Sequence, residues 1–406
     1  MTTTGRVAFQ HANFRNFLFA RFLTTMAGEM QAVAVGWQIY GITHKPFDLG
    51  LVGLAQFLPG VLLFLIAGQT ADRYPRQRIL QFCFGAFAIV SALLWTLSLH
   101  GLTQVWPIYA VLVLQGVVRA FTTPAAQSLV PLTVPPEHFP NAIAWASSVF
   151  QFAMVLGPAI GGAMYGFTGS PLPVYAAAAV CSVVGMFLIS TVRLSGQVKS
   201  ARASVLEGLR YLWRAKIVLG AVSLDLFAVL LGGAVALLPV YARDILKVGA
   251  TGLGILRGAP SVGAVTMAIA LAHWPLRKRA GATMLWCVAG FGVFIVVFAL
   301  STNVMLSVAA LVLVGACDMV SVILRHTLVQ IATPDEMRGR VSAVNMIFIS
   351  ASNEVGQFES GLTAQWFGTV PAAALGGFGT ILVVLIWAAL FPELRRINEL
   401  QPTLRA

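Results

Sequence analysis

The chain has 406 residues, of which 58% are hydrophobic and 10% charged, and it carries a formal net charge of +12. Soluble domains carry about 25% charged residues, so the composition excludes an ordinary soluble globular protein. The basic residues recur in short segments between apolar runs instead of gathering on one exposed face, which argues against a nucleic-acid partner. The four cysteines lie inside apolar runs without the spacing of metal ligands, so we predict no disulfide and no metal site.

Apolar runs of about 20 residues, the length that crosses a bilayer as a helix, follow one another along the chain. We therefore predict an all-α membrane protein with twelve transmembrane helices in two pseudo-symmetric six-helix halves. The first run lacks a small-residue cleavage site and is expected to remain as a span. The predicted spans are 17–42, 48–68, 79–99, 106–130, 142–167, 172–192, 217–242, 250–272, 283–301, 304–328, 342–366 and 370–391.

The lysines and arginines between the spans predict the orientation. Nineteen of them fall in the two terminal segments and in every second loop, whereas the alternate loops hold only Lys45, Arg243 and Lys247. Basic loops remain in the cytoplasm. The asymmetry therefore predicts that both termini are cytoplasmic.

One long connection divides the chain into an N-terminal half, 1–192, and a C-terminal half, 217–406. The connection, residues 193–216, is basic, and its stretch 204–214 has apolar residues on one side of a helix. We predict an amphipathic helix along the cytoplasmic surface, with a loose linker as the alternative.

The two halves repeat at an offset of 199 residues, because Leu112-Val-Leu-x-Gly116 matches Leu311-Val-Leu-x-Gly315, and Gly157 and Gly162 match Gly356 and Gly361. Repeated halves with a substrate site at their interface are typical of secondary transporters.

The second and third spans are joined by the polar stretch Gly68-Gln-Thr-Ala-Asp72-Arg73-Tyr-Pro75-Arg76-Gln-Arg78. This stretch resembles the Gly-x-x-x-Asp-Arg/Lys-x-Gly-Arg/Lys-Arg/Lys loop of the major facilitator superfamily, from which Pro75 and Gln77 depart. The resemblance implies a cytoplasmic latch formed by Gly68, Asp72, Arg73, Arg76 and Arg78. An ordinary basic cytoplasmic loop is the alternative.

The fifth span contains Gly157-Pro158-Ala-Ile-Gly161-Gly162. This stretch resembles the Gly-Pro-x-x-Gly-Gly signature of the exporter branch of the superfamily. Together with the stretches 68–78 and 333–340, it is most similar to the bacterial exporters called transmembrane secretion effectors, the enterobactin-exporter group. The resemblance implies an antiporter that works outward, whereas glycine-rich packing of the kind found in any membrane bundle is the alternative.

Charged residues inside the spans are the main functional candidates, because an unpaired charge in a bilayer costs several kcal/mol. We predict that they form a proton-coupling or charge network. Its members are Glu29, Arg119, Asp225, Asp318, Arg325, Glu354 and Glu359.

Glu29 lies near the middle of the first span, where it could exchange a proton or recognise a cationic substrate; a fixed pair with Arg119 is the alternative. The superfamily resemblance implies that Arg119 takes part in proton transfer or holds an anionic group. Asp318 stands at the position equivalent to Arg119, which suits an ion pair between the halves. Arg325 follows Asp318 by two helical turns, about 10 Å along one face, so a structural network within that helix is also possible.

Glu354 and Glu359 are about 140° apart on a helix, so only one of them can face a narrow cavity. Their span is the most polar, and we predict that it forms a wall of the substrate path. The candidate cavity residues are Gln31, Trp37, Gln56, Trp145, Gln151, Asn345, Asn353 and Gln357.

The charged residues inside the spans predict proton coupling, and the resemblance implies a monomeric exporter in the bacterial inner membrane. Its partners would be the lipid bilayer, protons and, as the resemblance implies, a small organic molecule, siderophore-like or lipophilic and drug-like. The sequence contains no phosphate-binding loop, zinc motif or nucleophile motif, so we predict no cofactor and no enzymatic activity. The alternatives are uptake of an organic anion at Arg119 and a membrane sensor that does not transport.

Overall fold

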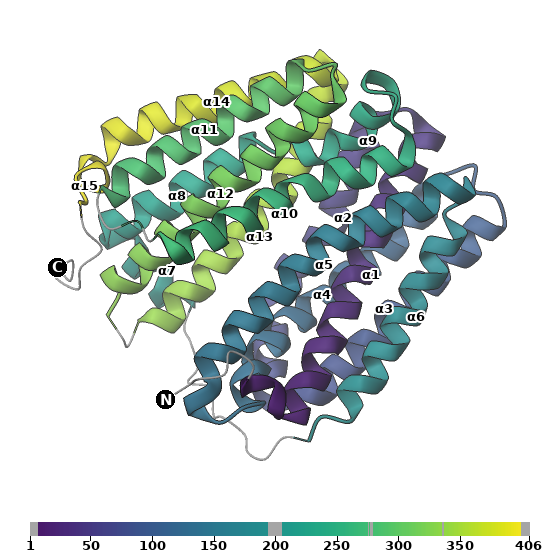
Figure 1. Cartoon of the computed structure of the whole chain (residues 1–406), viewed down its shortest axis with the longest axis horizontal. Coiled ribbons are helices and arrows are strands. Elements are labelled where there is room, and N and C mark those ends of the chain that lie inside the picture. Colours follow the sequence, from purple (N-terminus) through teal and green to yellow (C-terminus); the bar gives the residue numbers. More distant parts are fainter. Residues whose placement is uncertain (1–6, 194–204, 275, 277–278, 335–336, 399–406) are drawn as a thin grey trace. The chain divides into compact units, whose positions relative to one another are not determined.

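The computed structural model describes residues 7–193, 205–274, 276, 279–334 and 337–398 (Figure 1). Each predicted span coincides with a helical segment. The long helices are α1 (Ala12–Thr43), α2 (Pro46–Arg73), α3 (Arg76–Leu99), α4 (Trp106–Leu129), α5 (Phe139–Thr168), α6 (Leu172–Ser190), α8 (Lys216–Leu231), α10 (Gly249–His273), α11 (Ala280–Leu300), α12 (Val304–Ala332), α13 (Arg338–Phe367) and α14 (Thr369–Leu390). Short helices are η1 (Val7–Gln10), η2 (Val130–Leu132), η3 (Pro136–His138), α7 (Val205–Arg214) and α15 (Pro392–Arg395).

Ten helical stretches of the described residues are long and apolar enough to cross a membrane. The helices α1 and α13, with 32 and 30 residues, are also long enough to cross but are more polar. They carry three of the predicted charged candidates, Glu29, Glu354 and Glu359. The other four charged candidates, Arg119, Asp225, Asp318 and Arg325, lie on α4, α8 and α12.

The seventh span differs from the prediction of one continuous helix over 217–242. Here α8 ends at Leu231 and is followed by η4 (Ala234–Leu237), α9 (Leu238–Val240) and a turn of π-helix, η5 (Tyr241–Ile245). The break falls at Gly232-Gly233, where a methyl group on Gly232 would lie 2.6 Å from the ring of Phe291. Close packing against α11 at the break therefore requires a residue without a side chain.

The chain forms two compact units. Unit 1 comprises Met1–His44, Ala55–Ser200 and Val248–Gly258, and unit 2 comprises Lys45–Leu54, Ala201–Lys247 and Ala259–Ala406. The units follow the two halves of the sequence except in two short segments. The beginning of α2 belongs to unit 2, and the beginning of α10 belongs to unit 1.

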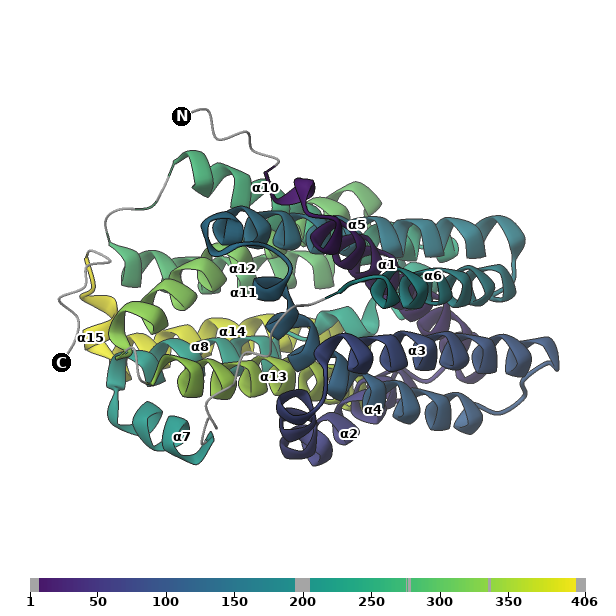
Figure 2. The same ribbon diagram turned by 90° about the horizontal axis from the view of Figure 1, so that it is seen from below.

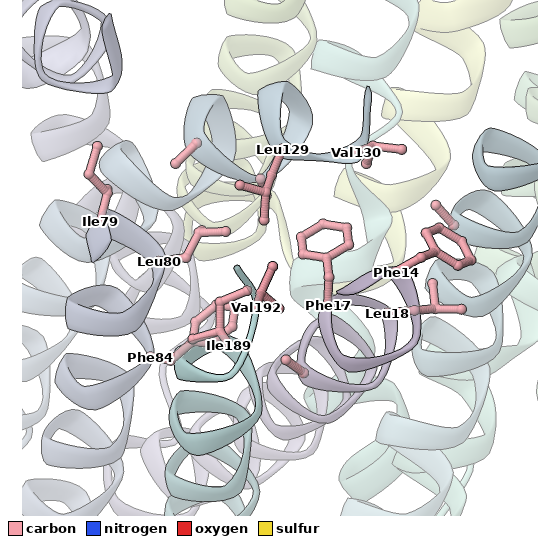
Figure 3. Packing of buried hydrophobic residues seen from close by; sticks show 14 of the residues in the cluster. Phe14, Phe17, Leu18, Ile79, Leu80, Phe84, Leu129, Val130, Ile189 and Val192 are labelled. Carbon is pink, nitrogen blue, oxygen red and sulfur yellow. The ribbon is translucent and has the colours of Figure 1, made fainter. Parts of the chain in front are cut away.

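In unit 1, α1 packs against α5 and α6, and α3 packs against α4 and α6. Phenylalanines and aliphatic side chains fill the end of this bundle at which α2 is joined to α3 (Figure 3). Phe14 and Phe17 of α1, Leu80 of α3 and Leu129 of α4 are completely buried there. This cluster fixes the helix ends that carry the polar stretch 68–78.

In unit 2, α11 packs against α12 and α14, and α8 packs against α13 and α14. The amphipathic helix α7 lies at the same end of unit 2 as α15 (Figures 1 and 2). Its apolar side faces α8, α12 and α13, where Leu212 is 1% exposed. The apolar face that the sequence predicted is therefore covered by protein.

Candidate functional site

Unit 1 contains an ion pair between α1 and α10. Glu29 Oε2 lies 3.5 Å from Arg257 Nε, and the two side chains are 21% and 26% exposed. The sequence suggested Arg119 as the alternative partner of Glu29 and did not single out Arg257. The rule that selected the other charges applies equally to Arg257, because it lies inside the predicted span 250–272.

The glycines of the exporter motif on α5 bring this pair together. A methyl group on Gly157 would lie 2.6 Å from Cβ of Glu29, and one on Gly161 would lie 2.7 Å from Cα of Met30. On Gly162 it would lie 2.8 Å from Cα of Gly254, on α10. The helix α5 therefore lies in close contact with both α1 and the first part of α10.

Pro158 is buried inside α5 between these glycines. Its carbonyl oxygen is the atom that a methyl group on Gly254 would strike. Since all four motif residues, Gly157, Pro158, Gly161 and Gly162, are buried at helix contacts, the motif determines how closely the charged side chains approach each other.

Gln31 belongs to a polar network that joins α1, α3 and α4. Its Nε2 donates to Gln115 Oε1 at 3.1 Å, and its Oε1 accepts from Ser91 Oγ at 2.8 Å. Gln31 is only 3% exposed, so its amide is already engaged inside unit 1. Arg119, one helical turn beyond Gln115 on α4, is exposed.

The remaining cavity candidates of unit 1 lie apart from one another. Trp37 makes an edge contact with Tyr165, with ring centroids 6.4 Å apart. Trp145 packs against Phe9 of η1, with ring centroids 4.8 Å apart. The backbone of Gln56 contacts Gly116, while Gln151 is half-buried on α5.

Unit 2 contains a second and more deeply buried ion pair. Arg325 of α12 pairs with Asp225 of α8, and their side chains are only 2% and 9% exposed. The sequence had placed Arg325 on a common face with Asp318 of its own helix. Asp318 lines a small cavity with Ser321 and with Asp225, the partner of Arg325. The cavity has room for about one water molecule.

The two glutamates of α13 have different partners. Glu354 is 9% exposed and accepts a hydrogen bond of 3.2 Å from Gln357 Nε2. Glu359 is half-buried, and its Oε1 accepts from Thr363 Oγ1 at 2.7 Å.

Asn345 is 3% exposed, and its Oδ1 has no hydrogen-bond partner among the described residues. Asn353 is exposed and donates to the carbonyl of Ile349 at 2.8 Å. The polar side chains of α13 are therefore distributed between the interior and the surface of unit 2.

The loop motif is anchored to neighbouring helix ends. Arg76 Nη1 donates to the carbonyl of Ser128 at 3.1 Å. Gln77, which departs from the superfamily pattern, donates to the carbonyls of Ile189 and Ser190 at 3.1 and 3.0 Å. Pro75, the other departure, immediately precedes α3, where a missing N–H leaves no helical hydrogen bond unmade.

Gly68 of this motif is half-buried, and the side chains of Arg73 and Arg78 are exposed. The side chain of Asp72 lies outside the described part of the structure.

A family model described as transmembrane secretion effector matches residues 3–405. The chain belongs to this family. It is 26% identical over 402 residues to the enterobactin exporter EntS of Shigella boydii serotype 4 (strain Sb227), covering 98% of this chain and 96% of that protein. The same identity and coverage hold for the enterobactin exporter EntS of Escherichia coli (strain SMS-3-5 / SECEC).

Solved structures of transporters share the fold. A mutant form of the peptide transporter POT matches with a TM-score of 0.77 at 11% identity, covering 96% of each chain. A bacterial homologue of the lysosomal transporter Spinster matches with a TM-score of 0.73 at 15% identity, covering 100% of this chain and 99% of that one. This transmembrane secretion effector is thus a multi-pass membrane transporter of the major facilitator superfamily, with its all-α fold.

Proposed function

We propose that this transmembrane secretion effector is a proton-coupled exporter that moves a small organic molecule outward across the bacterial inner membrane by alternating access. The export direction is supported by the Gly157–Gly162 motif and by relatives that are named exporters. The observation that carries the coupling proposal is the partly exposed ion pair between Glu29 and Arg257.

The two ion pairs differ in the property that proton exchange requires. Asp225 and Arg325 are almost completely buried, so water reaches this pair far less readily. Glu29 and Arg257 are 21% and 26% exposed, so water can reach the carboxylate. A proton bound at Glu29 would remove one charge of the pair and release Arg257. The contact between α1 and α10 would then depend on the state of protonation.

The substrate class follows from the relatives and from the polar helices. The relatives are named for enterobactin, and we propose a siderophore-like or lipophilic substrate for this chain. The exposed guanidinium of Arg119 on α4 would pair with an acidic group of such a molecule. The polar residues of α13, including Glu354 and Gln357, would form another wall of the path.

The remaining proposals concern the arrangement in the membrane. Both termini would lie in the cytoplasm, as the basic loops predict. The stretch Gly68–Arg78 would then act as a cytoplasmic latch that makes charged contacts in the outward-open state. The protein would act as a monomer, as its membership of the major facilitator superfamily implies.

Proton movement in proteoliposomes tests this proposal. A trapped pH-sensitive dye reports proton flux while siderophores, lipophilic drugs and organic anions are added one at a time. We expect one compound class to drive proton flux, and we expect Glu29→Gln and Arg257→Gln to abolish it. The matched control is Glu137→Gln, since Glu137 is exposed in η3 outside the candidate helices.

Two outcomes would overturn the proposal. If compounds cross the membrane without protons, or if Glu29→Gln retains coupled flux, Glu29 does not couple transport to protons. If an organic anion accumulates inside the vesicles together with protons, the protein is an uptake system. Wild-type orientation in the vesicles is determined in parallel by protease access to the termini.

A further inference from the structure

The helix α7 presents a cationic and aromatic surface. Arg210, Trp213 and Arg214 are exposed on one side of it, and Lys216 is exposed at the start of α8. Trp213 is 67% exposed. We call these four residues the α7 basic face. No described acidic residue forms a salt bridge with Arg210 or Arg214.

The opposite side of α7 is fixed to unit 2. Leu212 is buried against α8, α12 and α13, and Tyr211 donates a hydrogen bond of 2.9 Å to the carbonyl of Ala332. Burial raises the pKa of the Tyr211 phenol, so this donor remains protonated at physiological pH. Glu207 pairs with Arg340 of α13 at 2.7 Å. The basic face is therefore held in a fixed orientation and is not a mobile side of a linker.

The position of the basic face along the chain places it at the membrane boundary. A single residue, Ala215, separates α7 from α8. The stretch Lys216–Ile245, which begins with α8, is one of the candidate membrane spans. Arg214 and Trp213 are consequently within one helical turn of the residue at which the apolar span begins.

This combination fits one kind of ligand. Tryptophan is enriched where a membrane meets water, because its ring is amphipathic. The arginine guanidinium binds phosphate through two parallel hydrogen bonds. Clusters of basic residues beside a membrane span attract anionic lipids. The apolar span that begins one residue after α7 favours a lipid headgroup over a soluble protein partner.

We propose that the α7 basic face binds the headgroups of anionic phospholipids in the adjacent leaflet, with Arg210 and Arg214 on the phosphates and Trp213 at the level of the headgroups. The inference goes beyond the proposed function and does not depend on the identity of the substrate or on proton coupling.

Lipid binding to the full-length protein tests the inference. The protein in detergent is titrated with phosphatidylglycerol or with phosphatidylcholine, and bound lipids are counted by native mass spectrometry. The double variant R210Q/R214Q should bind phosphatidylglycerol about 30-fold more weakly, since each basic residue near an anionic surface contributes about 1 kcal/mol and 1.4 kcal/mol is a factor of ten. Binding of phosphatidylcholine should not change.

The control R395Q/R396Q removes two exposed charges from α15 and the residue that follows it, at the same end of unit 2. If binding is specific to α7, the loss of binding free energy for phosphatidylglycerol in this control should be less than about a third of the loss in R210Q/R214Q. Equal losses in both double variants would show only general charge attraction and would overturn the inference.

A second measurement locates the lipid. Phosphatidylglycerol brominated near the headgroup should quench the fluorescence of Trp213, obtained as the difference between wild type and Trp213→Phe. The absence of quenching at Trp213 would overturn the inference even if the affinities differ. The quenching measurement needs only one substitution, of the exposed side chain of Trp213, so the variant is expected to fold normally.

Discussion

Replacing Arg325 with methionine should destabilise the protein more than replacing Arg325 and Asp225 together. Arg325→Met removes the charge but retains a long apolar side chain, so a cavity is not the main effect. It leaves the carboxylate of Asp225, 9% exposed, without the guanidinium that pairs with it. In the double variant R325M/D225N, neither charge of the pair remains.

The burial of the pair sets the expected magnitude. Removing one partner of a buried ion pair costs about 3–5 kcal/mol, because the other charge remains desolvated. The double variant leaves a neutral amide, and a buried polar group without a partner costs about 1–3 kcal/mol. The double variant should therefore be about 2 kcal/mol more stable than the single variant.

Reversible unfolding in mixed micelles, followed by circular dichroism, measures the free energy of unfolding of the wild type, the two single variants and the double variant. Arg395→Met is the control, because Arg395 is exposed on α15 and its replacement should change stability by less than about 0.5 kcal/mol. If the double variant loses the sum of the two single effects, the residues are not coupled and the reasoning about this pair is wrong.

Three further predictions test other parts of the structure. Gly161→Ala should reduce transport, because its methyl group would strike the α1 backbone, whereas Gly28→Ala, with nothing within 4 Å, should not. Hydrogen exchange of α7 should rise strongly in Leu212→Ala, which costs about 2–5 kcal/mol of packing, and little in Glu207→Gln, since a half-exposed ion pair contributes at most about 1 kcal/mol. Asp72→Asn should reduce transport but leave an intact, monodisperse protein; unchanged transport would exclude the proposed latch.

The positions of the helices could be predicted because the bilayer fixes their length and apolarity. The prediction 106–130 corresponds to α4, Trp106–Leu129, and the prediction 172–192 to α6, Leu172–Ser190. The break after Leu231 could not be predicted in this way. Glycines are common inside membrane helices, and the close approach of Phe291 to Gly232 becomes visible only in the folded chain.

The charged candidates could be recognised as a class, but their partners could not. The cost of burying a charge identifies Asp225, Arg325 and Glu29 from their position in apolar runs. Which charge lies opposite depends on which helices are neighbours. Arg325 pairs with a residue of α8 that is 100 positions earlier in the chain. Glu29 pairs with Arg257, which comes from the second half of the sequence but belongs to unit 1.

The internal repeat indicates what the glycines do in both halves. Gly162 permits close approach to Gly254 of α10 in unit 1, and its repeat partner Gly361 permits close approach to Gly50 of α2 in unit 2, with distances of 2.8 and 2.7 Å from the added methyl group to Cα. Equivalent glycines therefore make equivalent helix contacts, each with a segment that comes from the other half of the sequence.

The internal repeat does not extend to the charged residues, so the two units differ chemically at this helix contact. Gly157 faces Glu29 on α1, whereas its repeat partner Gly356 faces the backbone carbonyls of Val229 and Leu230 on α8. A glycine contact alone is thus sufficient for packing, and it does not require a carboxylate at that point. Because an intramembrane charge is costly unless it has a use, the carboxylate present in only one of the two equivalent contacts supports the proposal that Glu29 couples transport to protons.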